Sequence, residues 1–283
     1  MNPDPNEAAG RLILPEIPLA DWRESRDTVH RYARLAGSLR AELTPRQKHW
    51  WHVTLHAAAA GLTTTPIPTG DRTLELMLDL TRHRMLISTS AGEREALPLE
   101  GQSVAGVYRD LLERLAELDI YPRFDGGPFA VDTPATYDAA AVMRYWRALA
   151  WIDGVFKQFR GELREETGPV QVFPHHFDLS MNWFSGRLVP DADPSDEESA
   201  DEQMNFGFLS GDDGISEAYF YVTAYPQPEG LTDTALPEGA FWFTEGFAGA
   251  VMMYQTVREA PDPRATLLNF LRAVHRAGSQ RMG

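Results

Sequence analysis

The 283-residue sequence contains no cysteine, and its only lysines are Lys48 and Lys157. The absence of cysteine excludes disulfide bonds, thiolate nucleophiles and zinc sites built from cysteine. It also agrees with a reducing compartment, where disulfides are rare. A chain of this length with 43% apolar residues can bury a core without covalent cross-links.

Long hydrophobic runs are absent as well. No stretch approaches the roughly 20 apolar residues that span a bilayer. The first ten residues are polar and do not resemble a secretory signal. We therefore expect a cytoplasmic protein with no membrane partner.

Positive charge is the third shortage. The 26 basic residues stand against 41 acidic ones, which gives a formal net charge of −15. This surplus of acid repels a phosphate backbone and an anionic membrane surface alike. We therefore expect a small molecule, and no nucleic acid, as the partner.

Familiar reaction signatures are also missing. The sequence has no His-Glu-x-x-His motif, no glycine-rich phosphate loop and no Gly-x-Ser-x-Gly elbow. No motif therefore names a reaction, and function has to be inferred from how the residues are arranged.

The sequence does contain an internal similarity. The run from His52 to Leu55 resembles the run from His176 to Leu179, and each follows a segment of helical pattern, at 28–35 and 141–149. Each run is followed by a glycine, a turn that contains proline, alternating segments and a further helix. Such self-similarity predicts a repeated structural unit. The alternative is chance similarity, because the identities are few.

Hydrophobic periodicity predicts the elements of each unit. It predicts helices near 21–44, 103–118, 138–163 and 262–277, and strands near 50–59, 73–80, 84–90, 94–99, 170–184, 204–209, 216–225, 240–244 and 248–254. Together these elements predict an α+β fold with an internal duplication of an α-β-β-β-β-α unit. Its antiparallel sheets would be covered by helices on one face and would carry a polar, aromatic-lined cleft on the other.

The predicted boundaries follow the same pattern. Residues 1–17 are expected to form a flexible N-terminal tail, 18–120 the first α/β repeat, 121–136 a linker with several proline and glycine residues, and 137–280 the second repeat, which includes an acidic loop at 190–203.

Side-chain alternation along the strands places both histidines away from the apolar core. The predicted polar face carries Trp50, His52, Thr54 and His56 in the first repeat, His176, Asp178, Ser180 and Asn182 in the second, and Glu217, Tyr219 and Tyr221 further along. Aromatic rings interleaved with hydrogen-bonding groups are typical of small-molecule pockets. The alternative is that these rings form a second small core between the halves.

This face supplies the candidate site residues. The catalytic candidates are His52, His176, Asp178 and Tyr219, with His176 as a general base that Asp178 or Glu217 orients. The predicted substrate-binding residues are Trp50, His56, Asn182, Arg187, Glu217 and Tyr221. Arg187 could clamp a substrate carboxylate, or it could close a loop by bonding to backbone carbonyls.

A divalent metal ion is an alternative cofactor. If the halves pack about a pseudo-twofold axis, His52 and His176 become symmetry mates. Together with Glu202 or Asp178 they would make a set of donors suited to Fe(II), Mn or Zn. The predicted metal ligands are therefore His52, His176 and Glu202, and metal-free acid–base chemistry remains the other option.

Four segments of the sequence resemble the bacterial DUF5996 family of uncharacterised proteins. They are Leu19 to Trp22, the tryptophan-histidine string His49 to Leu55 with Gly61 to Thr64, Val155 to Phe159, and Phe177 to Leu179 with Phe184 to Arg187. The resemblance extends from about residue 14 to 277. It implies no catalytic role for any residue, because the family has no established activity.

Two hypotheses of different classes follow. The first is an enzyme that acts on a small organic molecule in a His/Asp/Tyr-lined cleft between the halves. The second is a non-catalytic module that binds a small molecule or, given the surplus acid, a partner protein with a basic patch. The sequence makes no prediction about the oligomeric state.

Overall fold

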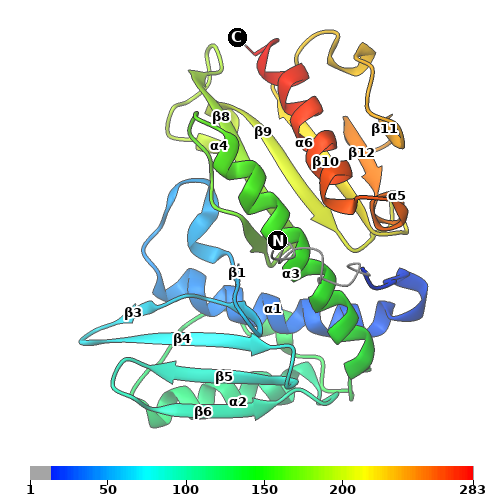
Figure 1. Cartoon of the computed structure of the whole chain (residues 1–283). Coiled ribbons are helices and arrows are strands. Elements are labelled where there is room, and N and C mark those ends of the chain that lie inside the picture. Colours follow the sequence, from blue (N-terminus) through cyan, green and yellow to red (C-terminus); the bar gives the residue numbers. More distant parts are fainter. Residues whose placement is uncertain (1–13, 283) are drawn as a thin grey trace, which may run out of the picture.

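A computed structural model describes residues 14–282 of the chain. Within this range the chain forms two antiparallel sheets of six strands each, flanked by helices (Figure 1). The predicted α+β class is thereby confirmed. None of the described helices is long and apolar enough to cross a bilayer. Residues 1–13 of the predicted flexible tail lie outside the described range, and Leu14 and Ile17 are buried.

The first half runs from a short 3-10 helix to α2. Its elements are η1 (Leu19–Asp21), α1 (Arg23–Leu43), η2 (Lys48–Val53), β1 (His56–Ala57), β2 (Gly61–Thr63), β3 (Ile67–Thr69), β4 (Arg72–Asp79), β5 (Arg84–Thr89), β6 (Arg94–Pro98) and α2 (Val104–Glu117). The strands form a sheet in the order β1-β2-β4-β5-β6, and β3 pairs with β4.

The second half begins after a crossover that contains η3 (Gly127–Phe129). Its elements are α3 (Ala139–Glu162), β7 (Gln171–Phe173), β8 (Asp178–Leu188), α4 (Glu197–Ala200), β9 (Asp201–Leu209), β10 (Tyr219–Tyr225), η4 (Leu231–Asp233), β11 (Ala240–Phe243), β12 (Gly249–Met253), α5 (Tyr254–Glu259) and α6 (Pro263–Ser279). The sheet order is β11-β12-β10-β9-β8-β7.

Local chemistry explains where three of the long helices begin. Asp138 accepts hydrogen bonds from the backbone N–H groups of Ala140 and Ala141 at the start of α3. Ser103 caps α2, and Asp262 caps α6, which also has a proline at its first position. These caps satisfy N–H groups that have no partner inside the helix. The four predicted helices are found close to their expected ranges.

The two sheets meet edge to edge. Leu55, just before β1, and Val172 of β7 exchange two backbone hydrogen bonds, of 2.9 and 2.7 Å. Arg40 of α1 donates to the backbone carbonyl of Thr54, and the Thr54 hydroxyl donates to Gln171 at 2.7 Å. The first half is therefore tied to the second by backbone and side-chain bonds at one point.

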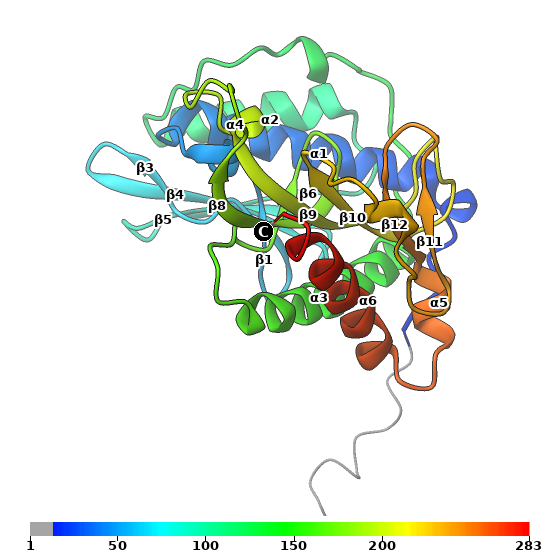
Figure 2. The same ribbon diagram turned by 90° about the horizontal axis from the view of Figure 1, so that it is seen from above.

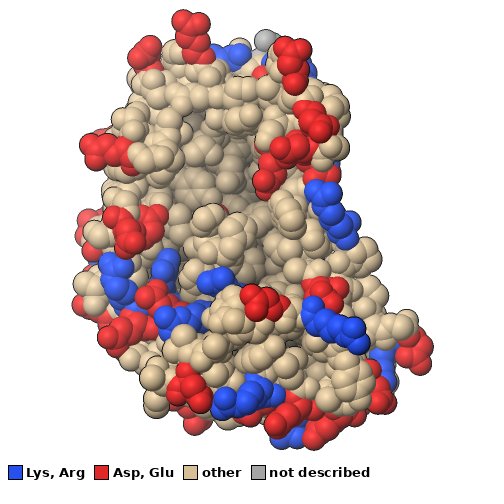
Figure 3. Space-filling view, turned by 180° about the vertical axis from the view of Figure 1, so that it is seen from behind, with Lys and Arg blue, Asp and Glu red and all other residues tan. Residues whose placement is uncertain are grey.

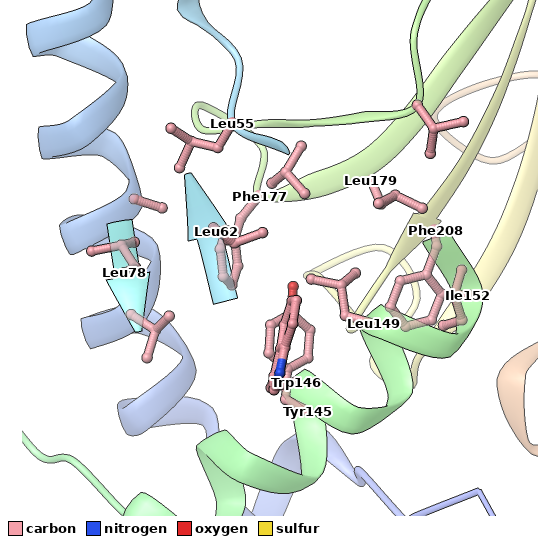
Figure 4. Close-up of a cluster of buried hydrophobic side chains, with 14 of the residues drawn as sticks. Leu55, Leu62, Leu78, Tyr145, Trp146, Leu149, Ile152, Phe177, Leu179 and Phe208 are labelled. Carbon is pink, nitrogen blue, oxygen red and sulfur yellow. The ribbon is translucent and has the colours of Figure 1, made fainter. Parts of the chain in front are cut away.

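A single large hydrophobic core extends through both halves. Figure 4 shows part of it: Leu55, Leu62 and Leu78 from the first half face Tyr145 and Trp146 of α3 and Phe177 and Leu179 of the second half. On the second sheet the core side packs against α3, α5 and α6, and α6 lies alongside α3 (Figures 1 and 2). The opposite face of that sheet is not covered by α3, α5 or α6, and the short helix α4 contacts β9.

The predicted strand over 50–59 is wrong. Residues Lys48–Val53 form a 3-10 helix, and only His56–Ala57 pairs as a strand. His49 and Trp50 have positive φ angles of 50° and 58°, so side chains no longer alternate along this segment. The apolar and polar faces assigned to residues 50–55 from strand parity therefore do not exist.

Candidate functional site

The face of the second sheet opposite α3, α5 and α6, termed the open face below, forms the floor of a pocket. Three rows of residues in register cross strands β8, β9 and β10: Ser180, Gly207 and Tyr221; Asn182, Asn205 and Thr223; and Phe184, Gln203 and Tyr225. Because side chains alternate along each strand, the residues between them point into the core. Most of this floor is polar, and it lies on the side that sequence parity assigned to Asp178, Asn182 and Tyr221.

The walls of the pocket come from three other segments. They are His49, Trp50 and Val53 of η2, Phe173, His175 and His176 around the turn before β8, and Glu198 of α4. The enclosed volume is about 480 Å³, within the range of small-molecule sites. The molecule is hollowed on this side, and acidic side chains stand on the rim (Figure 3).

Asp178 and Tyr221 are bonded to each other in the floor of the pocket. The Tyr221 hydroxyl donates to Asp178 Oδ2 at 2.6 Å and accepts a longer bond from Asn205 Nδ2 at 3.4 Å. Asp178 is 5% exposed, and Tyr221 is also buried. Asn205, Tyr221 and Asp178 therefore form a chain of hydrogen bonds across three neighbouring strands.

Gly207 makes room for the Tyr221 ring. A Cβ atom at position 207 would lie 2.2 Å from the Tyr221 Cζ atom, far inside van der Waals contact. The ring therefore lies directly on the backbone of β9. Any larger residue at position 207 would push the hydroxyl away from Asp178.

Burial raises the pKa of the Asp178 carboxyl above its ordinary value. The hydrogen bond from Tyr221, the electrostatic effect of His176 and smaller contributions from the Asp178 backbone N–H and the Ser180 hydroxyl lower this pKa but do not cancel the loss of solvation. The pKa of Tyr221 is also raised well above its usual range, by burial first and then by the neighbouring charge of Asp178. Tyr221 therefore remains a hydrogen-bond donor at neutral pH.

Two buried acceptors in the hydrogen-bonded series Asn205–Tyr221–Asp178 have no partner among the described residues. They are Asp178 Oδ1 and Asn205 Oδ1. A buried polar atom without a hydrogen bond costs about 1–3 kcal/mol. Since both residues line the pocket, a bound molecule that carries N–H or O–H groups would remove this cost.

A second set of hydrogen bonds holds the amide side chains of the floor. Asn182 Nδ2 donates to Gln203 Oε1 at 2.8 Å, and Gln203 Nε2 donates to the backbone carbonyl of Glu198 at 3.1 Å. This pair links strands β8 and β9 to α4. It fixes the end of the pocket away from Asp178.

Helix α1 positions the turn that leads into β8. His30 Nε2 donates to the backbone carbonyl of Pro174 at 2.8 Å, and its ring stacks on Phe177 with centroids 5.2 Å apart. Burial, followed by the charge of Arg26, lowers the pKa of His30 to about 4. A neutral His30 of the first half thus anchors the turn that carries His175 and His176.

The second sheet holds η2 at the other wall. His49 Nε2 donates to Asp201 Oδ2 at 2.8 Å, and Arg46 forms an ion pair with Glu197 at 3.5 Å. These contacts stabilise the positive φ angles of His49 and Trp50, which are costly for residues other than glycine. Backbone strain of this kind is often found at functional sites.

The structure brings five of the predicted site residues together. Trp50, His176, Asp178, Asn182 and Tyr221 line the pocket. Trp50 is 47% exposed. His176 precedes β8 in a turn and is exposed. The shared pocket results from strand alternation for the last three and from tertiary packing for Trp50 and His176.

Two predicted catalytic residues lie elsewhere. His52 is buried in η2, where its Nδ1 accepts a bond from the Gln47 backbone at 3.3 Å, and it does not line the pocket. Tyr219 shares the open face but donates to Asp212 at 2.6 Å. The pocket contains His176 and not His52, because the first histidine run forms a 3-10 helix and not a strand.

Three predicted substrate-binding residues are also outside the pocket. Arg187 is exposed and binds both carboxylate oxygens of Glu202. Glu217 is exposed beside Ile17 and Met253. His56 is partly buried in β1, and burial lowers its pKa to about 4.

The predicted metal ligands do not come together. Glu202 is bound by Arg187 and Ser185, and His52 does not line the pocket that contains His176. In residues 14–282, no group of three or more histidine or acidic side chains is placed to hold a metal ion.

Sequence reasoning missed His49, Gln203 and Asn205. Asn205 could have been found, because it alternates with Met204 and Phe206 in the strand predicted at 204–209 and so falls on the polar face. Gln203 continues this alternation but was assigned to the acidic loop at 190–203. His49 left no such signal, since its position depends on a positive φ angle and on Asp201, 152 residues away.

Comparison with known proteins identifies the family of the chain. Residues 14–283 match the model of a family of unknown function, DUF5996. The protein belongs to DUF5996. No curated protein and no solved structure matches it. The DUF5996 assignment covers both sheets and every residue of the pocket, and it brings no activity with it.

Proposed function

We propose that this DUF5996 protein is an enzyme that binds a small organic molecule on the open face of the second sheet and performs general acid–base chemistry on it. Asp178 would exchange the proton, Tyr221 would orient Asp178, and Asn182, Gln203 and Asn205 would hold polar groups of the substrate. The alternative is a module that binds the same molecule without converting it.

One observation carries the proposal. Asp178 is a buried carboxyl group with a raised pKa, a single hydrogen-bond donor and one free oxygen, and it lines a pocket of small-molecule size. Acids with perturbed pKa values concentrate at catalytic sites, because proton transfer is most efficient when the pKa lies nearer to the working pH.

We also infer that the two halves arose by duplication. In support, each half begins with a long helix, continues through an antiparallel sheet whose first strands are consecutive, and ends with a helix. The antiparallel exchange between Leu55 and Val172 joins the two sheets at the ends where each begins, next to β1 and in β7. The cleft would then lie between the halves, with η2 of one against the sheet of the other.

The test compares the native protein with Asp178→Asn. Each is incubated with a cellular small-molecule extract, and compounds lost and formed are followed by mass spectrometry, with ligand retention measured by equilibrium dialysis. We expect at least one compound to be consumed by the native protein and by Asp191→Asn, an exposed loop control, and not by Asp178→Asn. Retention of a compound by all three proteins without conversion would favour the binding module and contradict the enzyme.

A further inference from the structure

We propose that the pocket selects an organic cation, namely an ammonium or guanidinium group carried on an apolar or aromatic body. This inference rests on the proposed small-molecule pocket and gives the chemical class of its ligand. It is independent of which reaction, if any, follows binding.

The unpartnered groups of the pocket call for hydrogen-bond donors. Asp178 Oδ1 and Asn205 Oδ1 are both acceptors, and neither has a partner among the described residues. The single proton of the Tyr221 hydroxyl is already donated to Asp178 Oδ2. Ammonium and guanidinium groups carry several N–H donors and no acceptor, so they complement such a site.

The charges of the pocket favour the same class. Its lining contains the carboxyl groups of Asp178 and Glu198 and no lysine or arginine. Burial, followed by the neighbouring His176, lowers the pKa of His175, so that this imidazole is neutral at pH 7. Apart from the imidazoles of His49, which is bonded to Asp201, and of His176, the lining therefore offers no positive partner to a carboxylate or phosphate ligand.

Two basic residues at and just before the start of η2 are already engaged in ion pairs. Arg46 pairs with Glu197, and Lys48 pairs with Glu166. Arg46 also lies over the ring of Trp50, 5.6 Å from its centroid. Neither Arg46 nor Lys48 lines the pocket.

Aromatic rings stand where a cation could contact them. Tyr225 lines the pocket and is 45% exposed. Phe173 also lines the pocket, and it lies on β7 directly beside Asp178 of β8. The faces of such rings attract ammonium and guanidinium groups by roughly 0.5–2 kcal/mol. The site thus combines a carboxyl group with rings, as recognition of organic cations requires.

An apolar surface adjoins the pocket through Tyr221. Tyr219, Tyr221 and Val251 form a second buried cluster on the open face, against which pack the partly buried residues Leu209, Ile215, Phe243, Phe247 and Met253. Tyr221 belongs to this cluster and to the pocket. A ligand with its charged end at Asp178 can therefore place its carbon skeleton on this cluster.

The experiment measures binding by isothermal titration calorimetry of three probes of similar shape: phenethylammonium, 2-phenylethanol and phenylacetate. Butylammonium and butylguanidinium extend the cationic set. We expect the best cation to bind at least tenfold more tightly than 2-phenylethanol, and phenylacetate not to bind. Asp178→Asn should weaken binding of the cation at least tenfold and Glu198→Gln about threefold, whereas Asp191→Asn should bind like the native protein.

Three results would overturn the inference: no cation binds, 2-phenylethanol binds as tightly as the best cation, or phenylacetate binds best. Failure here is distinct from failure of the proposed function. If the native protein consumes a neutral or anionic compound and Asp178→Asn does not, the proposed enzyme activity is supported and the selection of a cation is contradicted. If a cation binds and no compound is converted, the selection of a cation is supported and the proposed enzyme activity is contradicted.

Discussion

Asp79 ends strand β4 of the first sheet and Asp178 begins strand β8 of the second, and both carboxyl groups are buried, with 1% and 5% exposure. Their partners differ. Asp79 Oδ1 accepts bonds from Thr81 and from the Arg82 backbone, and Oδ2 accepts one from Arg84 at 3.1 Å. Asp178 has one donor, Tyr221, and one free oxygen.

The pKa values differ in the same sense. Burial alone would raise the pKa of Asp79, but the bonds from Thr81 and Arg84 outweigh it and hold the pKa below its ordinary value. At Asp178 burial prevails and the pKa is raised. Burial thus indicates a reactive carboxyl group only when donors are too few to compensate for lost solvation. By this criterion we expect Asp79 to stabilise the fold, and we propose Asp178 as the functional carboxyl group.

The largest expected difference between the two residues is in turnover. Asp178→Asn should lower the rate of the proposed reaction by about 10²–10⁴-fold, the range for loss of a general acid or base. Asp79→Asn should leave the rate per folded molecule within about twofold. Initial rates, normalised to folded protein by circular dichroism, measure both. If both variants lost the same fraction of the rate per folded molecule, the proposed difference in role between Asp178 and Asp79 would be contradicted.

The second difference is in the free energy of unfolding, and here the substitution of Asp79 should have the larger effect. Asp79→Asn should lower the free energy of unfolding by about 3 kcal/mol, because Arg84 loses a charged partner in a buried position. Asp178→Asn should change it by less than about 1 kcal/mol, since one of its oxygens has no bond to lose. Urea denaturation at pH 7 provides the measurement. A larger loss at position 178 would argue that Asp178 is a structural residue.

A third prediction concerns Gly207, which supports only the Asp178 site. Gly207→Ala should destabilise the protein by about 1–3 kcal/mol through overpacking against Tyr221, and it should weaken ligand binding. Gly154→Ala is the matched control, because a Cβ there meets nothing within 4 Å and lies in helix α3. The control should gain up to about 1 kcal/mol. Thermal and urea unfolding distinguish the pair.

The smallest effect is in how stability depends on pH. Asp79 contributes stability that is present above its ordinary pKa and is lost as pH falls through the lowered value. Asp178, protonated more readily in the folded state, destabilises the fold progressively as pH rises from 3.8 toward its raised pKa. Relative to Asp178→Asn, the native protein should therefore lose stability with rising pH, by at most about 1.4 kcal/mol per pH unit.

Urea midpoints between pH 4 and pH 8 test this sign. Tyr221, Tyr219 and Tyr145 interact with Asp178, but their raised pKa values keep all three protonated between pH 4 and pH 8, so they do not contribute to the difference. The charge of His176 also acts on Asp178, and His176 is present in both proteins. The opposite result, in which the native protein becomes more stable relative to Asp178→Asn as pH rises, would show that the Asp178 carboxylate is well solvated or paired in the folded protein.

Much of the fold could be predicted because it depends on local patterns. Helical periodicity and caps located α1, α2, α3 and α6, and alternation placed Asp178, Asn182 and Tyr221 on the open face. These inferences need only neighbours in sequence. The floor of the pocket was predictable for the same reason.

The walls of the pocket were not predictable in this way. His49 and Trp50 reach the pocket through a 3-10 turn whose conformation depends on Asp201 and Glu197, about 150 residues further along the chain. The similarity between the two histidine runs suggested a strand in both places, and only the second run leads into one. The candidate site proposed from the structure is therefore built on the Asp178 carboxyl group and Tyr221, and not on the predicted pair of histidines.

The two hydrogen bonds between Leu55 and Val172 affect how the chain responds to cleavage. A protease that cuts the crossover at 121–136 breaks a covalent connection but neither this backbone pairing nor the core shared by the halves. The fragments are expected to elute together and to unfold in a single transition. The halves would then behave as one cooperative unit, in which a ligand bound to the second sheet also protects the first from unfolding.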